Sequence, residues 1–120
     1  MAQKEQKPPA FQLYARDWLV STAALSSAEQ GVYMRLLCHE WVEGPLPSDE
    51  HILARLAGES LHQFRGIWRR IERHFPALPG GGFGNPRLEA ERQRLAALRQ
   101  ERAASGRKGA RSRWERTANG

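Results

Sequence analysis

The chain has 120 residues, of which 40% are hydrophobic and 27% charged, a composition that indicates one soluble globular domain with solvated ends. Its apolar runs fall short of the roughly 20 residues of a membrane span, and its N-terminus lacks the apolar segment of a secretory signal. A single cysteine, Cys38, excludes an internal disulfide, so we expect a cytoplasmic protein with Cys38 buried on a helix. The net charge of +6 lies in residues 87–120, where ten Lys and Arg stand against four Asp and Glu, while residues 1–86 carry nine of each.

This charge distribution favours a polyanionic partner, most commonly nucleic acid, over the alternative of a tail that only improves solubility.

The first predicted elements are a flexible leader over residues 1–10 and a short extended segment over residues 11–20. Ser26 and Glu29 then form the S-x-x-E capping box, in which each side chain can accept from the other residue's backbone amide. The dense apolar spacing that follows predicts a central helix over residues 27–43.

A second, short helix is predicted over residues 49–57. Ser48 is its expected N-cap, and Gly58 is placed to end it. The proline-rich connector before it cannot be helical, although Leu46 could form one residue of edge pairing.

A third helix is predicted from Leu61 to the residue before Pro76, with two well-separated faces. Its apolar face consists of Leu61, Phe64, Trp68, Ile71 and Phe75. Its basic face consists of His62, Arg65, Arg69 and Arg73. A solvated face usually mixes acids with bases, so this basic face favours contact with DNA over plain solvation.

Glycine and proline dominate residues 76–86 and predict a β-hairpin with a glycine tip, whose return arm is anchored on the core by Phe83. The glycines lack the Lys-Ser/Thr ending of a phosphate-binding loop. A basic helix is expected from there to about Ala104, and the polar, glycine-spaced residues 105–120 are expected to be disordered in isolation.

No constellation of catalytic residues is apparent. The four histidines have no metal-ligand spacing, and no serine lies in the sequence context of a nucleophile elbow. We therefore expect a protein that is not an enzyme, with no catalytic residue, metal site or cofactor.

The predicted fold is mainly α with a small β-hairpin, a winged helix-turn-helix with an additional basic C-terminal helix. The winged-helix domain would span residues 11–88, between the leader over residues 1–10 and the basic helix over residues 89–104, with the disordered basic tail over residues 105–120.

In the order and spacing of several sequence stretches, the chain resembles the YdaU family, which is found mainly in phage and prophage genomes. The matching stretches are YARDWL (residues 14–19), LSSAEQGVYMRLL (25–37), GPLPSDEHILARLAG (44–58), Phe75, NPRLEAE (85–91) and SGRKGARSRW (105–114). The resemblance implies a winged-helix fold related to the N-terminal domains of phage replication initiators, and it supplies no catalytic residue. It also implies a bacterial host cytoplasm as the site of action.

The leading hypothesis is binding of duplex DNA during phage replication initiation. The basic face of the third helix would enter or flank the major groove, because arginine pairs bidentately with guanine edges and with phosphate. Phosphates would also be contacted by the tail residues Arg107, Lys108, Arg111 and Arg113. Two alternatives are a docking module for a phage or host replication protein and a transcriptional regulator of the prophage. No membrane partner is expected.

Overall fold

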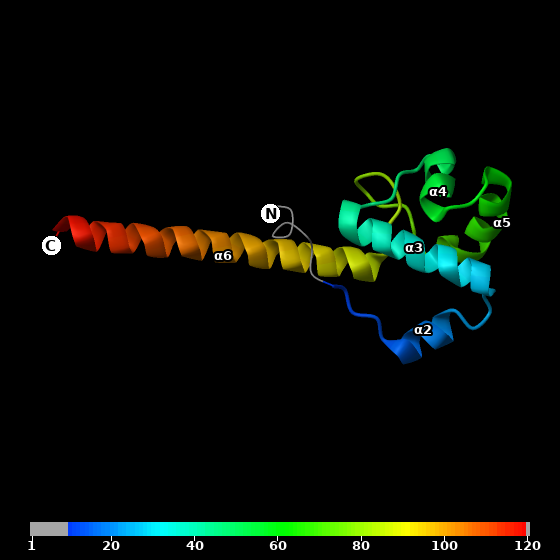
Figure 1. The fold of residues 1–120 in the computed structure, drawn as a ribbon, viewed down its shortest axis with the longest axis horizontal. Coiled ribbons are helices and arrows are strands. Elements are labelled where there is room, and N and C mark those ends of the chain that lie inside the picture. The colour runs from blue at the N-terminus through cyan, green and yellow to red at the C-terminus, as the bar shows by residue number, and fades with distance from the viewer. Residues whose placement is uncertain (1–9, 120) are drawn as a thin grey trace. The chain divides into compact units, whose positions relative to one another are not determined.

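A computed structural model describes the backbone of residues 10–119 and the side chains of residues 10–106. The chain forms two units, Met1–Glu89 and Ala90–Gly120. The helices are α2 (Ala15–Ser21), α3 (Ser27–Glu43), α4 (Glu50–Ala57), α5 (Leu61–Ile71), the 3-10 helix η1 (Glu72–His74) and α6 (Pro86–Asn119), which spans the boundary between the units (Figure 1).

The central helix α3 begins and ends where its sequence predicts. Ser26 Oγ accepts from the Glu29 amide at 3.1 Å, and Glu29 Oε1 accepts from the Ser26 amide at 2.8 Å, which confirms the capping box. Each pair among α3, α4 and α5 is in contact, and the core of the first unit lies between these helices. The predicted order of three helices is therefore correct.

The short turn between α4 and α5 also follows local signals. Gly58 adopts a left-handed conformation with φ 75°, which ends α4 as predicted. Ser60 Oγ then accepts from the Gln63 amide at 3.2 Å and caps α5. The N-cap of α4 is Asp49 and not Ser48, because the Asp49 carboxylate reaches the amide of His51 at 2.8 Å.

The predicted β-hairpin, and with it the wing of the winged helix, is wrong. Among residues 10–119 there is no strand, and pairing is limited to isolated bridges that join Phe83 to Leu46 and to Ala77. Pro76 and Pro79 lack the amide that a ladder needs, so two continuous arms cannot form. The fold of the described residues is mainly α, and residues 76–84 form a loop that returns to the connector at Leu46.

From Ala15 onward, the segment that was expected to be extended forms helix α2 instead, whereas residues 11–14 are not helical. No residue of α2 is fully buried, and its Trp18 is half-buried. The Thr22 hydroxyl donates to the Trp18 carbonyl at 2.6 Å at its C-terminal end, and Trp18 packs on Tyr33 with ring centroids 4.9 Å apart. An alternating apolar pattern of only two residues, Phe11 and Leu13, was too short to establish a strand.

A buried carboxylate organises the start of α6. Glu40 is fully buried, and its two oxygens accept from the Asn85 amide at 2.9 and 3.1 Å. Asn85 in turn accepts from the Leu88 amide at 3.2 Å and caps the helix. The backbone of α6 continues to Asn119, beyond the end expected near Ala104. The division of the chain into four segments, with residues 105–120 disordered in isolation, stays a prediction.

Several expectations about burial can be compared directly with the structure. Phe64 and Phe75 of the predicted apolar face are buried as expected, whereas Trp68 and Phe83 are only half-buried. The structure also corrects the expectation that Cys38 is buried, because this thiol is exposed. Within residues 10–119, no helix is both long enough and apolar enough to span a membrane.

Candidate nucleic-acid interface

Helix α5 separates its basic and apolar residues onto different faces. His62, Arg65 and Arg69 are exposed, whereas Phe64 and Ile71 are 1% and 0% exposed. This separation follows from residues three and four apart sharing a face of a helix. Arg73 is exposed as well, although it lies in η1 and not in α5, so all four predicted contact residues lie at the surface of the first unit.

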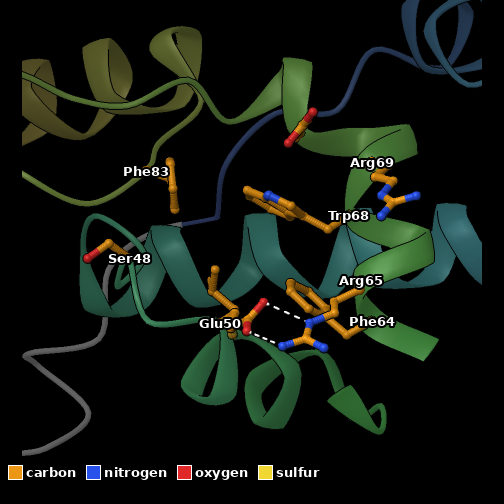
Figure 2. A pocket seen from close by; sticks show the side chains of 9 residues that line it. Ser48, Glu50, Phe64, Arg65, Trp68, Arg69 and Phe83 are labelled. Carbon is orange, nitrogen blue, oxygen red and sulfur yellow. Dashed lines mark hydrogen bonds and ion pairs between the residues drawn. The ribbon is translucent and has the colours of Figure 1, made fainter. Parts of the chain in front are cut away.

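Arg65 is engaged by a neighbouring helix. Its guanidinium forms a bidentate ion pair with the Glu50 carboxylate in the first turn of α4, with 3.0 Å between Arg65 Nε and Glu50 Oε2 (Figure 2). The hydrogen bond from Arg65 lowers the pKa of Glu50. The pair uses one donor on Nε and one on Nη2 and places a negative charge beside Arg65, so this arginine attracts a phosphate less strongly than an unpaired arginine would.

Arg69 lines a pocket that lies between α4, α5 and the loop carrying Phe83. Its guanidinium forms no ion pair with another described residue. The adjacent Arg70, which is not part of the predicted set, is held elsewhere. Its Nη2 donates to the Ala24 carbonyl at 2.8 Å, and its Nε lies 3.5 Å from Glu29 Oε2. Arg69 is thus the best-placed arginine of α5 for a ligand.

Arg73 lies in η1, next to a different set of side chains. Its Nε donates to His74 Nε2 at 3.4 Å, and the His74 ring stacks on Tyr33 with centroids 4.5 Å apart and planes 13° from parallel. Burial lowers the pKa of His74, and the positive charge of Arg73 lowers it further. The structure does not bring Arg73 to the pocket that Arg65 and Arg69 line.

The stacked histidine should make stability depend on pH. Because the pKa of His74 is lower in the folded than in the unfolded protein, folding favours its neutral form. The free energy of unfolding should be highest above the unfolded pKa of about 6.5 and should fall as pH drops below it. Thermal melts between mildly acidic and neutral pH would measure this dependence.

The control for this prediction is the exposed histidine of α5. His74→Phe should remove much of the acid sensitivity because phenylalanine does not titrate, and its ring can still stack on Tyr33, whereas His62→Gln should leave the sensitivity in place. Equal acid sensitivity in the wild type and in His74→Phe would show that His74 does not carry the effect.

A pocket of about 610 Å³ opens between α4, α5 and the loop that carries Phe83. Figure 2 shows the Trp68 side chain extending from α5 toward Phe83, with the Arg65–Glu50 pair beside Phe64. The residues that line the pocket are Ser48, Glu50, Leu53, Phe64, Arg65, Trp68, Arg69, Glu72 and Phe83.

Aromatic rings form the apolar part of this pocket. Trp68 lies near Phe64 and Phe75, with centroids 5.6 and 6.0 Å away and planes 25° and 20° from parallel. Phe83 lies 5.3 Å from Trp68 with its plane inclined by 56°. Sequence reasoning missed this pocket because Trp68 and Phe83 were both assigned to the core.

Two further observations concern the basic residues of α6. The side chains of Arg107, Lys108, Arg111 and Arg113 lie outside the described residues. Arg87, which was not predicted as a site residue, lies 3.7 Å from the Asp17 carboxylate and 4.8 Å from the centre of the Tyr14 ring.

In the described part of the chain, no group of three or more His, Cys, Asp or Glu side chains is arranged to hold a metal ion.

A comparison with protein families matches residues 9–93 to a family described as a protein of unknown function, DUF1376. Comparisons with curated proteins and with solved structures give no match. The family match covers the helices that form the pocket and ends before the basic residues 107–113.

Proposed function

The chain belongs to the DUF1376 family of proteins of unknown function. We propose that it binds DNA in the initiation of phage DNA replication. The phage setting rests on the resemblance of its sequence motifs to the YdaU family, which is an analogy of family and gene context. In this proposal the protein acts in the cytoplasm of the bacterial host, by binding and not by catalysis.

The observation that carries the proposal is the exposed basic row on α5. His62, Arg65 and Arg69 are exposed whereas Phe64 and Ile71 are buried, so the helix can present its basic residues to DNA while its apolar residues stay in the core. An α-helix fits the major groove of B-form DNA, and arginine offers two parallel donors to guanine. The basic residues of α6 add an attraction to phosphate that does not depend on sequence.

Replacing Arg69 tests whether α5 reads DNA. Arg69→Ala should weaken binding to a preferred duplex by about 1–3 kcal/mol and relax sequence preference, because a bidentate contact to a base edge is lost. Selection from random duplexes at near-physiological salt, followed by affinity measurements, would check this result. Folding should survive because Arg69 is exposed.

The matched control is Arg55→Ala, which removes an exposed arginine of α4 that does not line the pocket. This variant should retain the selected motif. If no motif is recovered with the wild type, or if both variants retain it equally, α5 does not read the DNA sequence.

The ion pair on α5 leads to a second prediction about affinity. Glu50→Gln removes the carboxylate that holds Arg65, so duplex affinity should rise several-fold as Arg65 becomes available to phosphate or base. Titration of one labelled duplex with both proteins would measure the change. Glu43→Gln, at an exposed position outside the pocket, removes one negative charge without releasing Arg65. An equal gain in both variants would attribute the effect to net charge alone.

A further inference from the structure

We propose that the pocket between α4, α5 and Phe83 binds one unpaired nucleobase of a single DNA strand. The inference rests on the proposed function, because it names the form of DNA that the same surface recognises. It makes the protein a reader of opened DNA in addition to the duplex that α5 contacts.

The first support is the arrangement of the two half-buried rings. Trp68 is fixed by its neighbours Phe64 and Phe75, so its position does not have to be ordered when a ligand binds. Trp68 and Phe83 are in contact, with centroids 5.3 Å apart and planes inclined by 56°, and both are half-buried, so a base would stack on their exposed surface and not between them. Aromatic side chains that remain partly exposed on a fixed support are what single-stranded nucleic acids stack on.

The second support is the charge of the rim. The lining holds two guanidinium groups, of Arg65 and Arg69, and two carboxylates, of Glu50 and Glu72. Their charges cancel, so the pocket offers a phosphate little attraction. A nucleobase is neutral and presents both donors and acceptors on its edges. Among the residues that line the pocket, Arg69 carries donors, and Glu72 and Ser48 carry acceptors, of the kinds that such an edge requires.

The third support is the size of the pocket, together with the kind of base that can enter it. Its volume of about 610 Å³ falls in the range of small-molecule sites. A base within a duplex has both faces stacked and its pairing edge occupied, so it cannot enter. The pocket therefore selects unpaired strands, which initiation of replication exposes when a duplex opens.

Three probes of equal length separate base recognition from phosphate attraction in the full-length protein. They are a mixed-sequence single strand of about 12 nucleotides, the same strand with abasic sites throughout, and the corresponding duplex. The normal strand should bind about tenfold or more tighter than the abasic strand, which has the same phosphates but nothing to stack. Equal affinity for these two strands would overturn the proposal and favour an apolar side chain of a partner protein as the occupant.

A variant and its control locate the effect in the pocket. Trp68→Leu should reduce affinity for the normal strand to that for the abasic strand and should leave the abasic affinity unchanged. Trp18→Leu changes a half-buried tryptophan that packs on Tyr33 and lies outside the pocket, so it should preserve the preference. A preference for the normal strand that persists in a folded Trp68→Leu protein would overturn the assignment.

A crosslinking experiment on the wild type makes the test independent of how variants fold. A strand that carries a single 5-iodouracil should crosslink to Trp68 or Phe83 on irradiation. Crosslinks confined to α6 would overturn the pocket and leave DNA binding intact. Failure of all three probes to bind would instead overturn the proposed function itself.

Discussion

Replacing Gly82 with alanine should lower the free energy of unfolding by about 3–4 kcal/mol. Gly82 has φ 75°, a conformation that costs a residue with a Cβ roughly 1–2 kcal/mol. The added Cβ would lie 2.3 Å from the Leu46 carbonyl oxygen. This steric clash can be relieved only if the backbone moves. That movement separates Leu46 from Phe83, whose amides and carbonyls pair at 2.7 and 2.9 Å, and each lost hydrogen bond costs about 1 kcal/mol.

Gly80→Ala is the matched control, two residues earlier in the same loop. A Cβ at Gly80 would meet nothing within 4 Å, and its φ is not positive, so stability should change by no more than about 0.5 kcal/mol. Urea unfolding of both variants would measure the difference. If Gly82→Ala were as stable as Gly80→Ala, the contact between Leu46 and Phe83 would not form in solution. Because Phe83 borders the pocket, Gly82→Ala should also weaken binding of the single strand.

Neutralising the basic residues of α6 should have the largest effect on DNA affinity. With Arg107, Lys108, Arg111 and Arg113 all changed to glutamine, binding should weaken for every duplex sequence alike, because phosphates carry no sequence information. The slope of log affinity against log salt should flatten by about 3–4 if all four residues neutralise phosphates. The melting temperature should stay nearly unchanged, since these positions lie beyond the family match that ends at residue 93.

A smaller pair of variants controls for total charge. Arg111 and Arg113 changed together should flatten the salt slope, whereas Arg16 and Arg55, two exposed arginines of the first unit, should leave it nearly as it was. Titrations of one duplex at several salt concentrations would compare the two. If both pairs had the same effect, net charge and not the basic end of the chain would govern affinity.

The local sequence was sufficient for the three helices that form the core of the first unit. The Ser26–Glu29 capping box, the left-handed Gly58 and the apolar spacing of α5 each act within about four residues along the chain, so they can be read from the sequence. The same spacing placed His62, Arg65 and Arg69 together on an exposed face. The excess of positive charge after residue 86 is likewise a property of composition.

Only the tertiary structure decided how these residues are used. Glu50 meets Arg65 from another helix, 15 positions away, and no local pattern identifies that pair. Phe83 reaches Trp68 because the loop after Pro76 returns to Leu46, where a single residue pairs and no hairpin forms. Helical and capping signals are local, whereas ion pairs and pockets depend on which surfaces meet after the helices pack. The sequence therefore determined the helices α3, α4 and α5 and the basic face of α5, and packing decided which arginine is engaged and where a pocket opens.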